Sequence, residues 1–121
     1  MENTDVSKLP LYEPCRFVRC EVGDGQLFFV GESKYVCHRD LVRRILGIEI
    51  EMETAEVERL VKGDKRFKDM GTVNKLNDFV VVGSTSLELN FPSKTDLPEV
   101  RKVTMEEFRK QNPGTLFIER T

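Results

Sequence analysis

The sequence predicts an α+β fold, a compact single domain of β-hairpins with three short helices. Apolar residues alternate on both sides of a glycine-rich turn in the N-terminal third of the chain, which is typical of a β-hairpin. Three other segments combine helical apolar spacing with a capping or stop residue. With 121 residues, the chain has room for one hydrophobic core.

The composition is that of a globular protein with a well-charged surface. Hydrophobic residues make up 39% of the chain, and 19 basic residues against 21 acidic ones give a net charge of -2. This balance argues against a strongly basic nucleic-acid binder. No apolar run approaches the roughly 20 residues that span a bilayer, and no signal-peptide pattern follows Met1. We therefore expect no membrane association and a nuclear or cytoplasmic location.

The chain divides into a tail and a domain. Residues 1–14 are polar and contain Pro10 and Pro14, which predicts a flexible N-terminal tail. Residues 15–121 are expected to form a single α+β interaction domain.

The domain is expected to begin with a hairpin. Cys15–Val22 alternates imperfectly, which predicts a strand with a bulge. Gly23-Asp24-Gly25 supplies the turn, since glycine adopts positive φ at little cost, and Leu27–Val30 is the return strand. Lys34–Cys37 is expected to continue extended.

A short amphipathic helix is predicted over Arg39–Leu46 and ends at Gly47. A second is predicted over Ala55–Lys62, with Thr54 as its N-cap. The core face of this second helix would consist of Val57, Leu60 and Val61.

The C-terminal half carries three further signals. Phe79–Phe91 predicts a hairpin that turns at Gly83-Ser84 or Ser84-Thr85. Thr104 and Glu107 have the spacing of a capping box for a helix over Met105–Gln111. Thr115–Ile118 is expected to be a last strand on a sheet edge, whereas Lys62–Gly71 is interpreted as a basic connector.

Little in the sequence indicates chemistry. Cys15, Cys20, Cys37 and His38 are the candidates for a zinc site, but their spacing matches no familiar zinc motif, so we expect small buried or half-buried thiols and no metal or cofactor. Cys37 and His38 are neighbours in the chain, and adjacent side chains rarely aim at one another as a nucleophile and its base do. The sequence also lacks a phosphate-binding glycine loop, so we expect no enzyme.

Basic residues group in two places, separated by the acidic run Glu49–Glu58. We take them as the candidate surface for a partner protein or a nucleic acid, with ordinary solvated surface as the alternative. The candidate binding residues are His38, Arg39, Arg43, Arg44, Lys62, Lys65, Arg66 and Lys68.

The segment Leu27–Gly47 resembles the Ski/Sno/Dachshund homology domain, in which an apolar strand, a glycine-containing turn and a cysteine lead into a helix. Phe28-Phe29-Val30, Gly31 and Cys37 carry this likeness, and Val103–Phe108 is similar to the family's closing strand and helix. The resemblance implies a winged-helix-like part and a role in transcription through protein partners, and in some members DNA. A shorter stretch is also similar to the N-terminal DNA-binding modules of Bro and KilA type.

We therefore expect a non-enzymatic binding module of a nuclear or regulatory assembly that acts through protein–protein contacts. The alternative is a DNA-binding domain that contacts the phosphate backbone through the first helix and the 62–68 connector. Edge strands at Phe79–Val82 and Thr115–Ile118 are also candidates for pairing with a second copy of the chain.

Overall fold

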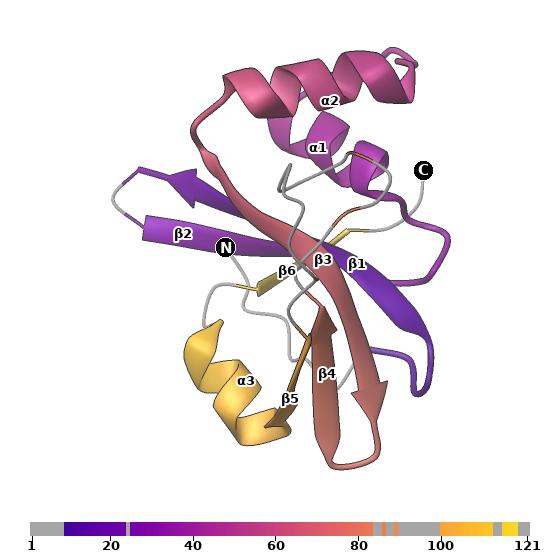
Figure 1. Ribbon diagram of the computed structural model, residues 1–121, viewed down its shortest axis with the longest axis vertical. Coiled ribbons are helices and arrows are strands. Elements are labelled where there is room, and N and C mark those ends of the chain that lie inside the picture. The colour runs from indigo at the N-terminus through magenta and orange to yellow at the C-terminus, as the bar shows by residue number, and fades with distance from the viewer. Residues whose placement is uncertain are drawn as a thin grey trace.

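The computed structural model describes residues 9–23, 25–83, 86, 89, 100–112 and 115–118. In this part of the chain, three helices accompany one six-stranded sheet with the order β5-β4-β3-β1-β2-β6 (Figure 1). Five strands are antiparallel to their neighbours, and β6 joins β2 in parallel. The predicted α+β class is confirmed. The elements are β1 (Pro14–Val22), β2 (Gly25–Gly31), α1 (His38–Leu46), α2 (Thr54–Gly63), β3 (Phe67–Leu76), β4 (Phe79–Gly83), β5 (Val100–Thr104), α3 (Met105–Gln111) and β6 (Thr115–Ile118).

The predicted N-terminal hairpin is confirmed. β1 and β2 pair in antiparallel register, with Phe17 opposite Val30 and Val22 opposite Gly25. The bulge predicted within this first strand lies in its neighbour instead: Arg19 and Cys20 are consecutive, but their partners in β3 are Asp69 and Phe67, so the extra residue is Lys68 of β3. Residues 34–37 do not continue extended as predicted. They form a turn, in which the Val36 amide donates to the Ser33 carbonyl.

The interpretation of Lys62–Gly71 as a connector was wrong, because β3 begins at Phe67 and occupies the middle of the sheet. The bulge explains why the alternation is hidden in the sequence. Cys20 pairs with Phe67 and Val18 with Met70, so Phe67 and Met70 pack in one core cluster although their spacing is odd.

The predicted hairpin over Phe79–Phe91 was also wrong. β4 pairs with β3 on one side and with β5 on the other, so neither edge of β4 is left for the segment that follows it. Most of that segment, Phe91 included, lies outside the described residues. Consequently Phe79–Val82 is not an edge strand, whereas β6 lies at the sheet edge as predicted.

The three predicted helices are present, with small corrections. α1 ends at Gly47, whose φ of 71° is the left-handed conformation expected of a glycine at a helix end. α3 begins with the predicted capping box, since the Glu107 amide donates to Thr104 Oγ1 and the Thr104 amide to Glu107 Oε1. The N-cap of α2 is Glu53, one residue before the predicted Thr54, and Leu60 is 39% exposed instead of buried.

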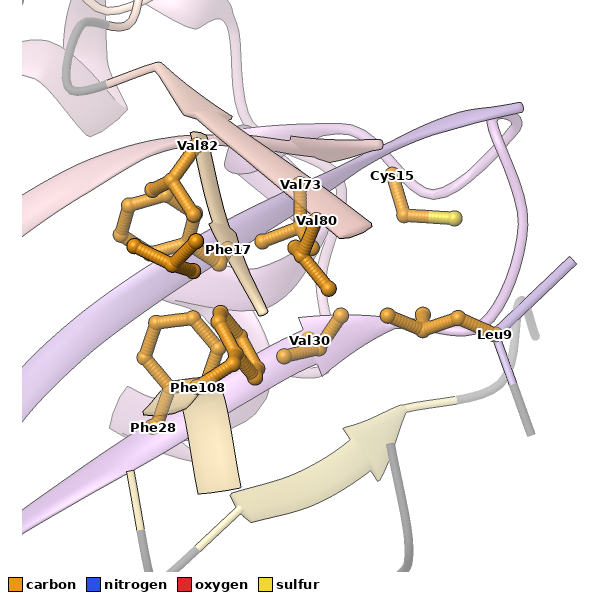
Figure 2. Packing of buried hydrophobic residues seen from close by; sticks show 10 residues of the cluster. Leu9, Cys15, Phe17, Phe28, Val30, Val73, Val80, Val82 and Phe108 are labelled. Carbon is orange, nitrogen blue, oxygen red and sulfur yellow. The ribbon is translucent and has the colours of Figure 1, made fainter. Parts of the chain in front are cut away.

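One face of the sheet is covered by α3, and we call it the α3 face. Its core centres on three aromatic rings: Phe17 stacks on Phe28 with ring centroids 4.7 Å apart, and Phe108 of α3 meets Phe28 edge-on at 5.6 Å. Figure 2 shows this cluster, in which valines of β2, β3 and β4 surround the rings. Leu9 is buried in the same cluster, so the folded part of the chain begins before the boundary predicted at Pro14. Residues 1–8 of the predicted tail lie outside the described residues.

The opposite face is covered by α1 and α2, and we call it the α1–α2 face (Figure 1). It uses the alternate residues of the same strands, so that Val18 of β1 points here while Phe17 points to the α3 face. The cluster on the α1–α2 face consists of Val18, Val36, Leu41, Val42, Val57, Val61, Phe67, Met70 and Leu89. No helix in the described residues is long and apolar enough to cross a membrane.

Candidate functional site

His38, a predicted surface residue, lies in the interior. Its side chain is 3% exposed, at the first position of α1. Nε2 lies 2.7 Å from the Gly71 carbonyl oxygen and Nδ1 lies 2.9 Å from Ser86 Oγ. The prediction that His38 contacts a partner was therefore wrong, and the reason is that its buried imidazole lies between the Gly71 carbonyl of β3 and the Ser86 hydroxyl.

The partners of His38 determine its tautomer. Since a carbonyl only accepts, Nε2 carries the hydrogen and donates to Gly71, which leaves Nδ1 to accept from the Ser86 hydroxyl. Ser86 Oγ in turn accepts from the Leu89 amide. Burial, more than any neighbouring charge, lowers the pKa of His38 to about 4, so the imidazole is neutral at pH 7.

A serine hydroxyl on a histidine is also the arrangement of a nucleophile and its general base. A nucleophile needs access to its substrate, however, and Ser86 is only 2% exposed. In this conformation the hydrogen-bond chain joins α1, β3 and Ser86 through the buried imidazole.

The three thiols lie apart, as small buried or half-buried side chains. Burial raises the pKa of Cys15 to about 11 and also raises the pKa of Cys20. Cys37 precedes α1, where its amide donates to Asp40 Oδ2 at 2.9 Å. The described residues contain no group of three or more potential metal ligands.

The arginines of α1 are largely engaged by nearby groups. Arg39 Nη1 lies 3.4 Å from Thr54 Oγ1, and Arg43 donates to the Glu49 carbonyl at 3.1 Å. Arg43 also forms an ion pair with Glu51 at 3.6 Å, and only 15% of its side chain is exposed. Arg44 is exposed.

Three of the four basic residues from the end of α2 to the start of β3 also have acidic partners. Lys62 pairs with Glu58 at 3.5 Å and Lys68 with Glu21 at 3.1 Å. Arg66 Nη2 lies 2.7 Å from Asp64 Oδ2, and the hydrogen bonds from Arg66 lower the pKa of Asp64. Lys65 is exposed.

The structure therefore replaces the segregated charges expected from sequence with local pairs. The acidic run contributes Glu51 and Glu58 to two of those pairs. We call this region, which carries α1, α2 and the start of β3, the paired surface. A phosphate backbone that crossed it would meet carboxylates beside these cations.

A surface that sequence reasoning missed lies on β4 and β5. Phe79 is 41% exposed and Val100 is 65% exposed. Lys102 Nζ lies 4.1 Å from the centroid of the Phe79 ring, a cation–π contact. We call Phe79, Val81, Val100 and Lys102 the β4–β5 patch.

The register places the patch on one side of the sheet. Val81 pairs with Lys102 and Gly83 with Val100, whereas Val80, Val82 and Val103 point into the core of the α3 face. The patch therefore lies on the α1–α2 face. α1 packs on β1 and β2, which lie on the other side of β3 from β4 and β5. No short-range sequence signal could have found the patch, because strands distant in the chain form it.

β5 is also an outer strand of the sheet. Its basic residues point to opposite faces: Lys102 belongs to the patch, and Arg101 lies on the α3 face opposite Val82. Arg101 is close enough to Arg19 to contribute, after burial, to lowering the pKa of Arg19, although Asp69 acts in the opposite direction. Each face of the sheet therefore carries one basic residue of β5.

Comparisons with protein-family models, with curated proteins and with solved structures found no match to this chain. The resemblances to the Ski/Sno/Dachshund domain and to the Bro and KilA modules therefore stay predictions.

Proposed function

We propose that this protein is a non-enzymatic protein-binding module and that the β4–β5 patch is its main contact surface. The observation that carries the proposal is the exposed aromatic and aliphatic area of Phe79 and Val100, beside a lysine and an outer strand. Aromatic side chains are enriched at protein interfaces, and apolar side chains grouped on a sheet face favour a partner more than solvent.

The paired surface supports the proposal by contrast. Four of its cations already have carboxylate partners within the same domain, namely Arg43, Lys62, Arg66 and Lys68, so it offers less charge to a phosphate backbone. A role in a nuclear regulatory assembly is part of the proposal, and it rests on the sequence resemblance alone.

Site-specific photo-crosslinking in cells tests the proposal. A photoreactive residue at Val100 should give a discrete protein adduct, and the same residue at Arg44 on the paired surface should not. The adduct should disappear on Phe79→Glu and persist on Leu60→Glu, a matched change of an exposed apolar side chain on α2. Equal adducts from Val100 and Arg44, or no adduct at Val100, would contradict the proposed surface.

A DNA titration tests the alternative. Binding to generic duplex DNA at low salt, with affinity that falls steeply as salt increases, would favour a DNA-binding domain. We expect no such binding, because most of the candidate basic residues are paired or buried.

A further inference from the structure

We propose that the β4–β5 patch binds an amphipathic helix of the partner protein, and that the apolar face of this helix carries a carboxylate that pairs with Lys102. This inference rests on the proposed function and specifies the chemistry of the partner. A helix that lies on a sheet buries one apolar stripe of side chains against it. A cation that is covered in this way needs a counter-charge, and the partner has to supply it.

The side chains of the patch form three successive rows on one face of the sheet. Phe79 lies in the first row, and Val81 pairs with Lys102 in the second. Val100 lies in the third row, opposite Gly83. The cation is therefore placed between an aromatic and an aliphatic side chain that are 41% and 65% exposed. Same-face neighbours along a strand are about 7 Å apart, so the three rows span about 14 Å.

A short helix that lies along these strands matches the rows. Positions i, i+4 and i+8 of a helix lie on one face and span about 12 Å along its axis. Apolar residues at i and i+8 would cover Phe79 and Val100, whereas Asp or Glu at i+4 would lie over Lys102. The order of side chains on the patch thus selects an apolar, acidic, apolar order on the partner.

Lys102 has its charge left for a partner. None of the ion pairs among the described residues includes it. Its ammonium lies over the Phe79 ring at 4.1 Å, which restricts the side chain to the middle of the patch. A partner carboxylate would therefore meet a cation that is already positioned, with less side-chain entropy left to lose on binding.

The fold already uses helices on this face of the sheet. α1 packs on β1 and β2, and α2 packs on α1, whereas Phe79 and Val100 stay exposed (Figure 1). A partner helix on β4 and β5 would continue this layer of helices across the sheet, as layered α+β packing favours.

A second copy of the chain is a poorer occupant of the patch. A contact of patch on patch would bring two Lys102 ammonium groups into one interface, and the patch contains no carboxylate to pair with them. Like charges that are covered without a counter-charge oppose association. The positions beside the patch on the same face are also uncharged, and they are Thr72, Asn74, Leu76 and Thr104.

Selection from a displayed peptide library tests the inference on the full chain. The library consists of helical peptides of about 15 residues, near the length at which isolated helices become stable in water. Positions i and i+8 of one face are apolar, and position i+4 is fully randomised. Peptides that also bind Phe79→Glu are removed, which restricts the selection to the patch.

We expect enrichment of Asp and Glu at position i+4. In fluorescence anisotropy, a selected peptide should bind Lys102→Glu about five to ten times more weakly than the unchanged chain, because attraction becomes repulsion. The same peptide with lysine at i+4 should regain affinity for Lys102→Glu. The control Lys62→Glu, on the paired surface, should leave the affinity unchanged. Circular dichroism and thermal unfolding check that each variant remains folded.

The outcomes separate this inference from the proposed function. Equal enrichment of acidic and basic residues at i+4, or equal binding to Lys102→Glu, would overturn the pairing with Lys102. Binding that survives a proline in the middle of the peptide would overturn the helix, because proline breaks a helix interior. If no peptide passes the selection but the Val100 crosslink persists, the inference fails and the proposed function stands. Loss of the crosslink as well would contradict both.

Sedimentation experiments test the second copy. We expect no dimer that depends on the patch. A dimer that disappears on Phe79→Glu would favour the second copy as the occupant and overturn the inference.

Discussion

The paired surface and the β4–β5 patch both carry basic residues, and they differ in what those residues contact. On the paired surface, Lys62 and Arg66 meet carboxylates of residues close to them in sequence. On the patch, Lys102 lies over an aromatic ring instead. The density of positive charge along a sequence therefore does not by itself identify a binding surface. The decisive property is whether the fold leaves the charge, and apolar area beside it, for a partner.

The difference has a physical basis in chain distance. Ion pairs within a helix or a tight turn form wherever opposite charges are spaced for them, and exposed pairs contribute only tenths of a kcal/mol each. The patch requires β4 and β5 to meet, and it therefore depends on the packing of the whole sheet.

Removing the Phe108 ring of α3, which follows β5 in the chain, should cause the largest loss of stability. Phe108→Ala removes a ring that is 1% exposed and packs on Phe28, so we expect a loss of about 3–5 kcal/mol in the free energy of unfolding. Urea denaturation measures it. The control is Phe79→Ala, in which the ring lost from the patch is 41% exposed and the cost should be below about 1.5 kcal/mol. Equal losses would mean that the patch is part of the core.

Acidification should lower the free energy of unfolding through protonation of His38 of α1. The pKa of His38 in the folded protein is about 4, below its ordinary value of 6.5, so the unfolded chain binds the proton more readily. The stabilising effect is complete above pH 6.5 and is lost as the pH falls towards 4. Between pH 6.5 and 5, where few carboxylates titrate, we expect a loss of about 1.5 kcal/mol.

The matched variant for this prediction is His38→Gln, which should be less stable at pH 7 and should lack the added pH dependence in that window. Urea denaturation at pH 6.5 and pH 5 measures both chains. The same pH dependence with and without His38 would assign the effect to other groups.

The contact between Lys102 and Phe79 should contribute a smaller, measurable coupling. A double-mutant cycle with Lys102→Met and Phe79→Leu should give a coupling of about 0.5–1 kcal/mol in unfolding free energy, since the cation lies over the ring face. Coupling near zero would show that Lys102 is not held over the ring in solution.

The ion pairs of the paired surface should have the smallest effect. Lys62 and Glu58 form an exposed i,i+4 pair, and their coupling should be about 0.3–0.5 kcal/mol. It should fall further in 1 M salt, whereas the coupling of Lys102 with Phe79 should change less. A coupling above about 1 kcal/mol would contradict the view that this pairing is a local, weakly stabilising property.

The elements that were predicted correctly from sequence share one property. The residues that start, turn or end each of them lie within a few positions of one another in the chain. Gly23 and Gly25 flank the turn of the N-terminal hairpin, Gly47 ends α1, and Thr104 with Glu107 begins α3. In each case the backbone conformation or the capping hydrogen bond depends on side chains next to it. The residues of the candidate site were predicted less well, because burial and pairing are properties of the assembled sheet.

By itself, the sequence determined the fold class, the first hairpin, the three helices and the last strand, because local propensity and capping decide each of them. Only the tertiary structure decided that β3 lies at the middle of the sheet, since the bulge at Lys68, opposite Arg19 and Cys20, hides its alternation. The same holds for the interior position of His38 and for the β4–β5 patch. Both arise where strands distant in the chain meet, and no local pattern encodes which strand becomes the neighbour of which.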